Sequence, residues 1–343
     1  MSHRYFPSAN APAAAIAPVI MMALVLPMPV AAQTALASAK TKSAATKTWT
    51  PPRTPDGQPD LQGFWNNTTL TPLERPSELA GKQVLTEQEA IEYQRRVQEQ
   101  ADATPPGVLG RALGGYWFER GEVVAGRRSS LIVDPPDGRI PALTPAAQKL
   151  AAARAQERSL HPADGPEDRS LQERCLLWGG AGPPMLPTAY NSNYQIVQSR
   201  DYVMIFVEMI HDARIIPLDG RPHLGPEIRL WLGDSRGHWE GNTLVVDTTN
   251  FNGQTAFRGS SENLHLIERF TRTDADTIRY EFTVDDPATF TKPWTAEIPM
   301  RKAQGPIYEY ACNEGNYSLG DILKGARAEE KRAAEELSKP GSK

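Results

Sequence analysis

The stretch HLIERFTRTDADTIRYEFTV, His265–Val284, contains two segments of alternating polarity around a short acidic turn. Alternation with a period of two is typical of a strand with one buried face, and two such segments around a tight turn predict a β-hairpin. With the turn at Asp274–Asp276, Arg269 lies opposite Glu281 as an ion pair on the outer face. The inner face then carries Leu266, Phe270, Tyr280, Phe282 and Val284.

Glu268 is the exception on that inner face. It lies opposite Phe282 in this register, and a slip by one residue would bury Arg269, Arg279 and Glu281 instead. A carboxylate among apolar neighbours must be ion-paired, hydrogen-bonded or neutral, so Glu268 is interpreted either as half of a structural pair or as an active-site group. The candidate partners for a structural pair are Arg214, Arg229, Arg258 and Arg301.

Short segments with a period of two continue along residues 194–311. Tight-turn sequences such as DGR (219–221) and EGN (240–242) separate them. This pattern predicts a mainly β fold, an antiparallel up-and-down, lipocalin-like barrel of about 8–10 strands; a sandwich is the alternative. We expect an N-terminal helical and loop cover and a C-terminal helix.

Helix signals lie outside this region. Thr86 and Glu89 form a capping-box pattern, and Thr144 with Pro145 marks a second helix start. We therefore expect one barrel domain over residues 51–320 with a helical insertion at about 75–190. A C-terminal helix or tail should occupy residues 321–343.

The N-terminus has the pattern of a signal peptide over residues 1–32, with an apolar run, small residues and a cleavage site after Ala32. Pro18, Pro27 and Pro29 interrupt the run, which argues against an integral membrane span. Residues 33–50 are rich in Ala, Ser, Thr and Lys and predict a disordered linker. We expect a periplasmic or secreted protein.

Two cysteines, Cys175 and Cys312, are the whole cysteine content of the chain. In an oxidising compartment they predict one disulfide, which would contribute roughly 4–5 kcal/mol by closing a long loop. A catalytic thiol or a metal thiolate is the weaker alternative, because the sequence contains no CxxC motif.

Charge and motifs limit the function classes. The net charge of -4 and the pI of about 5.9 give no basic field for nucleic acid. No dinucleotide or P-loop fingerprint occurs, so we expect no cofactor. His211, His223 and His238 lack zinc-type spacing, so no metal is expected, and the GDSRG stretch at 233–237 is a turn rather than a serine nucleophile.

The GFW stretch, Gly63–Trp65, resembles the Gly-x-Trp of the first strand of lipocalin-like (calycin) barrels. In those barrels an arginine packs across the Trp, and Arg301 is the candidate here. PDGQPDLQGFW, VDPPDGRIPALTP, HDARIIPLDGRPH and GDSRGHWEGNTLVVDTTNF also resemble motifs of an exported bacterial family. The resemblance implies export and a lipocalin-like barrel and assigns no chemistry.

The stretch EMIHDAR, Glu208–Arg214, collects polar groups after an apolar run. We expect Glu268 and Glu208 to act as an acid/base pair, His211 as a second base, and Arg214 to stabilise developing negative charge. A solvated hairpin turn is the alternative for this stretch. The candidate ligand-binding aromatics are Trp231, Trp239, Tyr280, Phe282 and Tyr190.

The sequence therefore leaves three functions open. The preferred one is a barrel that encloses a small apolar or aromatic molecule and performs cofactor-free lyase, isomerase or hydrolase chemistry. The second is a non-catalytic carrier, and the third is an envelope interaction module; the oligomeric state is open. Two convergent titratable groups in a cavity favour the enzyme, one polar group favours the carrier, and a filled interior favours the interaction module.

Overall fold

The computed structural model describes most of the chain from Trp49 onward. The described residues are 49–103, 119, 121–124, 126–188, 190–254, 257–260 and 262–338. The chain divides into two units, 1–47 and 48–343. The expected signal peptide and most of the expected linker lie outside the described residues. No helix within them is long and apolar enough to cross a membrane.

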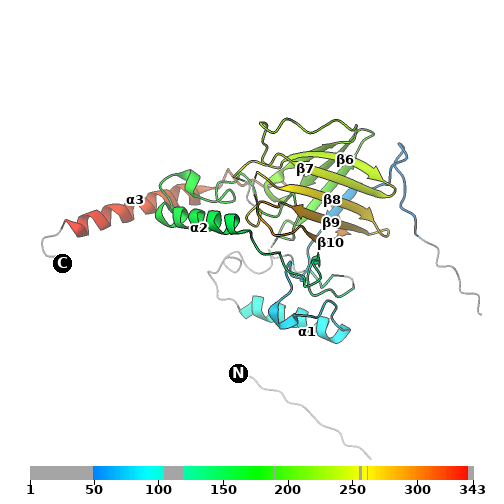
Figure 1. Cartoon of the computed structure of the whole chain (residues 1–343), viewed down its shortest axis with the longest axis horizontal. Helices are drawn as coiled ribbons and strands as arrows, with labels where there is room; N and C mark the ends of the chain where they lie inside the picture. The colour runs from blue at the N-terminus through cyan, green and yellow to red at the C-terminus, as the bar shows by residue number, and fades with distance from the viewer. Residues whose placement is uncertain are drawn as a thin grey trace, which may run out of the picture. The chain divides into compact units, whose positions relative to one another are not determined.

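Ten antiparallel strands build one nearly closed barrel, which confirms the predicted fold class (Figure 1). The sheet order is β5-β4-β3-β1-β10-β9-β8-β7-β6, and β2 pairs with β10. The strands are β1 (Gly63–Asn66), β2 (Ile132–Asp134), β3 (Asn193–Gln198), β4 (Tyr202–Val207), β5 (Ala213–Pro217), β6 (Asp234–Glu240), β7 (Thr243–Thr249), β8 (His265–Arg272), β9 (Thr277–Asp285) and β10 (Trp294–Lys302).

The two ends of the strand order, β5 and β6, approach each other and nearly close the wall. Gly237 of β6 faces Ile216 of β5 so closely that a Cβ at Gly237 would lie 2.8 Å from Ile216 Cγ2. A residue without a side chain is therefore needed where these two strands meet.

The register of the β8–β9 hairpin confirms the prediction. Arg269 lies opposite Glu281 and Glu268 lies opposite Phe282, so the faces are assigned as the alternation indicated. The expected ion pair of Arg269 with Glu281 is not the one formed, because Arg269 bonds Glu240 at 2.7 Å instead. The inner faces pack aromatic side chains: Phe270 and Tyr280 have ring centroids 4.9 Å apart. Burial of each such ring stabilises the fold by roughly 1.5–3 kcal/mol, so this hairpin is a main part of the core.

Trp65 on β1 belongs to the hydrophobic core. It is buried, and its Nε1 donates to the Leu61 carbonyl at 2.9 Å. The arginine over its ring is Arg272, 5.5 Å from the centroid, and not Arg301, which is exposed on β10. Arg272 lies at the end of β8, and its guanidinium is fixed there by the Asp60 carbonyl at 2.9 Å.

The helices begin where the capping signals predicted. Thr86 and Glu89 exchange the hydrogen bonds of a capping box, and the Thr144 side chain accepts from Ala147 N at 3.1 Å. α2 and α3 bury none of their residues. The helices are α1 (Glu87–Ala103), α2 (Pro145–Leu160) and α3 (Tyr317–Leu337), with short 3-10 turns η1 (Ser77–Leu79), η3 (Pro166–Asp168) and η4 (Met209–His211).

The predicted disulfide is present. Cys175 and Cys312 are joined with an S–S distance of 1.96 Å across a sequence separation of 137. Asn316 Nδ2, at the start of α3, also donates to the Glu173 carbonyl at 2.8 Å. The C-terminal segment is thus fastened to the segment that precedes β3.

Candidate functional site

Glu268 is paired with Arg214 inside the barrel. Arg214 Nη1 and Nη2 donate to Glu268 Oε1 and Oε2 at 3.2 and 2.6 Å, and the side chains are 8% and 0% exposed. Arg214 points inward because β5 alternates, with Arg214 and Ile216 buried and Ile215 exposed. Of the four candidate arginines, the structure selects Arg214. We call these two residues the interior pair.

Tyr280 connects the interior pair to a loop. Its hydroxyl donates to Glu268 Oε1 at 2.8 Å and accepts from Met185 N at 3.0 Å. Burial raises the pKa of Tyr280 well above its usual value, and the Glu268 carboxylate raises it further, so the hydroxyl remains a donor. The loop is residues 177–186, LWGGAGPPML, called here the Gly-Pro loop.

Glu208 lies in a different environment. On β4 the inner residues are Val203, Ile205 and Val207, so Glu208 continues the outward-facing series. Glu208 is nevertheless buried, and its carboxylate accepts hydrogen bonds from Asn191 Nδ2 and Asn193 Nδ2 at 2.7 and 2.8 Å. The structure therefore does not bring Glu208 to Glu268, and the expected acid/base pair does not share one site.

His211 is also outside the barrel interior. It is exposed, and its ring makes an edge contact with Phe206 at 4.4 Å between centroids. Its neighbour Asp212, which sequence reasoning did not single out as a site residue, lines a small cavity beside Arg214. Burial raises the pKa of Asp212 above its usual value.

That cavity, which Arg214 of the interior pair lines, has a volume of about 20 Å³. A water molecule needs roughly 10–15 Å³ measured in this way, so an organic molecule does not fit. Its wall includes Leu177, Gly182 and Pro183 of the Gly-Pro loop. The Nε of Arg214 is buried with no hydrogen-bond partner among the described residues.

A larger groove has a volume of about 640 Å³, and Leu177, Gly182 and Pro183 of the Gly-Pro loop line it as well as the small cavity. α2, residues 167–183 and the side chains of Trp231 and Phe257 line it. Trp178 also lines it, so three aromatic residues contribute to its wall. We call this space the aromatic groove. The Gly-Pro loop separates it from the interior pair.

The five predicted ligand-binding aromatics are divided between core and surface. Tyr280 and Phe282 are fully buried, and Trp239 is half-buried. Trp231, 37% exposed, lines the aromatic groove. Tyr190 lies beside the groove residue Trp178, with ring centroids 5.9 Å apart.

Sequence reasoning missed Trp178 and Phe257. Trp178 precedes a Gly- and Pro-rich run, GGAGPP, and such a run brings backbone close to its surroundings. An aromatic residue at the start of this run was the available signal. Phe257 gave no comparable signal, because the sequence around it lacks periodicity.

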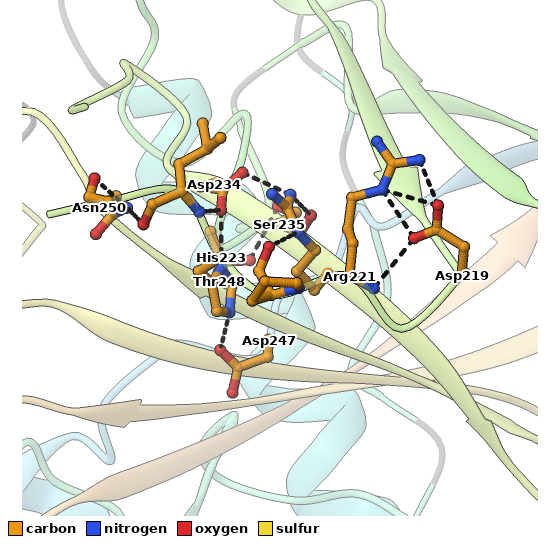
Figure 2. A network of polar contacts seen from close by, with 12 residues as sticks. Asp219, Arg221, His223, Asp234, Ser235, Asp247, Thr248 and Asn250 are labelled. Atoms are coloured by element: carbon orange, nitrogen blue, oxygen red, sulfur yellow. Dashed lines mark hydrogen bonds and ion pairs between the residues drawn. The ribbon is translucent and has the colours of Figure 1, made fainter.

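Alternating carboxylates and imidazoles form a chain along the outer face of β6–β9. Figure 2 shows its first part, in which His223 lies between Asp234 and Asp247. His223 Nδ1 and Nε2 lie 2.9 Å from Asp234 Oδ2 and 2.9 Å from Asp247 Oδ1. His265 Nε2 lies 2.7 Å from Asp247 Oδ2, and its Nδ1 lies 3.9 Å from Asp285 Oδ2. We call these five residues the Asp–His chain.

The Asp–His chain fastens the β5–β6 connection, residues 218–233, to the barrel. His223, in this connection, contacts one carboxylate of β6 and one of β7 through its two ring nitrogens. Arg236 Nη1 also bonds Asp234 Oδ1 at 2.6 Å. The same connection carries Trp231 into the aromatic groove and Leu232 to the small cavity.

The expectations for a metal site and for a serine nucleophile concern side-chain arrangement in the described residues. No cluster of three or more His, Cys, Asp or Glu residues in the described part of the chain is arranged to hold a metal ion. Ser235 of the GDSRG stretch is buried, and its hydroxyl bonds Thr248 Oγ1 at 3.0 Å rather than a histidine.

The fold and site define a mainly β barrel with a charged pair in its interior and an aromatic groove at its surface. No protein-family model matches the chain, and no curated protein matches it.

Proposed function

We propose that the protein binds a small aromatic organic molecule in the aromatic groove. One observation carries this proposal: the groove of about 640 Å³ has Trp178, Trp231 and Phe257 on its wall, whereas the cavity at the interior pair measures about 20 Å³. Sites for small molecules usually measure about 300–1,000 Å³ and are lined by aromatic and apolar side chains.

The aromatic wall is supported from the core. Phe257 stacks on the buried Trp294 with centroids 6.0 Å apart and an interplanar angle of 21°. It also makes an edge contact with the buried Phe282 at 6.4 Å. A ring held in this way loses little freedom when a ligand binds, which favours affinity.

The test is a titration of purified protein with polycyclic aromatic probes such as 2-naphthol, followed by calorimetry. The variant Trp231→Ala should weaken binding by about tenfold, since truncation of a central aromatic contact commonly costs more than 1 kcal/mol. Trp49→Ala is the matched control, because Trp49 and Trp231 are 38% and 37% exposed and Trp49 does not line the groove. Equal losses in both variants would contradict the proposal.

A second candidate function is acid–base chemistry at Glu268, with Arg214 stabilising negative charge. The observation that favours it is the Gly-Pro loop, whose residues line both cavities and whose Met185 is bonded to Tyr280. Opening of this loop would connect the groove to the interior pair. If Glu268→Gln, once shown to be folded, processes a groove ligand at the normal rate, this role is wrong.

We also propose that the protein acts outside the cytoplasm, as the leader-like N-terminus and the disulfide support. Expression of the full chain in a bacterial host should yield a mature protein that begins at Gln33. Edman sequencing of the protein from the periplasmic or medium fraction checks this. A chain that stays in the cytoplasm with residues 1–32 intact would refute it.

A further inference from the structure

Two half-buried arginines in the aromatic groove have no partner among the described residues. The side chains of Arg154 on α2 and Arg174 make no hydrogen bond or ion pair with any described residue. Every other buried or half-buried arginine in the described ranges has at least one such bond; Arg169, for example, bonds Glu173 at 2.6 Å. Polar side chains that are at least partly buried normally form hydrogen bonds within the protein, so Arg154 and Arg174 are unusual.

A third free cation lies next to them. Arg158 is exposed and is four residues after Arg154, so both occupy the same face of α2. Arg158 likewise makes no side-chain bond with the part of the chain that is described. The groove therefore offers three guanidinium groups that are free to bind a ligand.

The acidic residues of the groove make no ion pair with these arginines in the described structure. Glu157 lies 3.8 Å from His161, and Asp168 accepts from the backbone N of Gly165 at 2.7 Å. Glu167 alone among the groove carboxylates lacks a partner in the described structure. The groove thus holds three carboxylates beside three arginines that have no partner among the described residues, and these free guanidinium donors, not an excess of positive charge, favour a ligand with a carboxylate or similar anionic group.

Arg174 is close in sequence to Trp178, one of the aromatic residues of the groove wall. It directly precedes Cys175, which the disulfide fixes, and Trp178 follows four residues later; Arg174 and Trp178 both line the groove. A guanidinium group binds a carboxylate through two parallel hydrogen bonds. The groove thus combines a cationic part with an aromatic part.

We infer that the ligand of the aromatic groove is an aromatic carboxylate, whose ring contacts the aromatic wall and whose carboxylate is bound by Arg174 together with Arg154. This inference rests on the proposed binding function and deepens it by naming the class of ligand.

The experiment compares 2-naphthoate with its neutral amide, 2-naphthamide, by calorimetry on the full mature protein. The carboxylate should bind about tenfold more tightly than the amide at low salt, and this advantage should shrink in 0.5 M salt because screening weakens exposed charge interactions. Arg174→Gln should remove most of the advantage, because it weakens binding of the carboxylate more than binding of the amide. Arg174→Lys, which keeps the charge without the planar fork, should give an intermediate affinity.

Arg139→Gln is the matched control, since Arg139 is an exposed arginine outside the groove whose side chain is also unpaired among the described residues. If Arg174→Gln disturbs folding beside Cys175, the double variant Arg154→Gln/Arg158→Gln on the exposed face of α2 tests the same claim. Equal binding of acid and amide would overturn this inference and leave the binding function standing. Binding of neither probe would overturn both.

Discussion

At the residue scale, the interior pair explains why a strand aims a carboxylate at its own core. A buried charge is tolerated when it is paired and its remaining oxygens are hydrogen-bonded. Glu268 meets both conditions, because Arg214 binds both oxygens and Tyr280 binds one of them. The residue that looked anomalous in the sequence is a satisfied member of a network.

Removal of one member should therefore destabilise the barrel strongly. Arg214→Met leaves the Glu268 carboxylate buried without its counter-ion, and we expect the free energy of unfolding to fall by about 3–5 kcal/mol. The double variant Arg214→Met/Glu268→Leu should recover most of that loss. Urea denaturation followed by circular dichroism measures both.

The control for this prediction is Arg269→Met on the outer face of the same strand. Arg269 pairs with Glu240 at 2.7 Å in an exposed position, so its removal should change the stability by less than about 1 kcal/mol. Similar effects of Arg214→Met and Arg269→Met would contradict the structural role of the interior pair.

At the element scale, the Asp–His chain decides how firmly the β5–β6 connection is held. The hydrogen bond with Asp247 raises the pKa of His265, and the same bond lowers the pKa of Asp247. The other charged groups at the Asp–His chain are its own members Asp234 of β6 and Asp285 of β9, and Arg236 of β6, which bonds Asp234. The His265–Asp247 bond is therefore strongest at a pH where His265 is a cation and Asp247 is ionised.

The sign of the pH dependence follows from these shifts. The stabilisation by His265 is complete below its unfolded pKa of about 6.5 and is lost as the pH rises through the higher folded pKa. The contribution of Asp247 is lost only in acid, as the pH falls through its lowered pKa. The thermal midpoint should thus decline from about pH 6 toward pH 8.

His265→Gln should flatten part of this decline, and scanning fluorimetry across that range measures it. His238→Gln on β6 is the control, because His238 is exposed and bonds only Glu240, at 3.2 Å, outside the Asp–His chain. A slope that is the same in His265→Gln and in the unmodified protein would show that the His265–Asp247 bond does not cause the decline.

At the scale of the whole molecule, the disulfide restrains the unfolded chain. A loop closed across 137 residues should contribute about 5 kcal/mol in the chain-entropy model. Reduction and alkylation, or the double variant Cys175→Ser/Cys312→Ser, should lower the thermal midpoint by several degrees. An unchanged midpoint in calorimetry would mean that this crosslink adds no stability.

The sequence predicted those features that depend on near neighbours. Alternation gave the β8–β9 register, and the Thr86–Glu89 spacing gave the start of α1. It did not predict that β1 lies between β3 and β10, because strands far apart along the chain pair through tertiary contacts. The choice of Arg214 over three other arginines, and the separation of Glu208 from Glu268, depend on the same contacts.

The sequence by itself determined the barrel class, the faces of the strands and the cysteine pair, since periodicity and residue type are properties of the chain. Only the tertiary structure decided that the cavity beside the interior pair is small and that Trp178, Trp231 and Phe257 come together on the wall of one groove. The physical reason is packing: whether inward aromatic residues leave a cavity depends on how several strands fit together. Glu268 shows the difference, because its inward position follows from alternation and its partner follows from closure of the barrel.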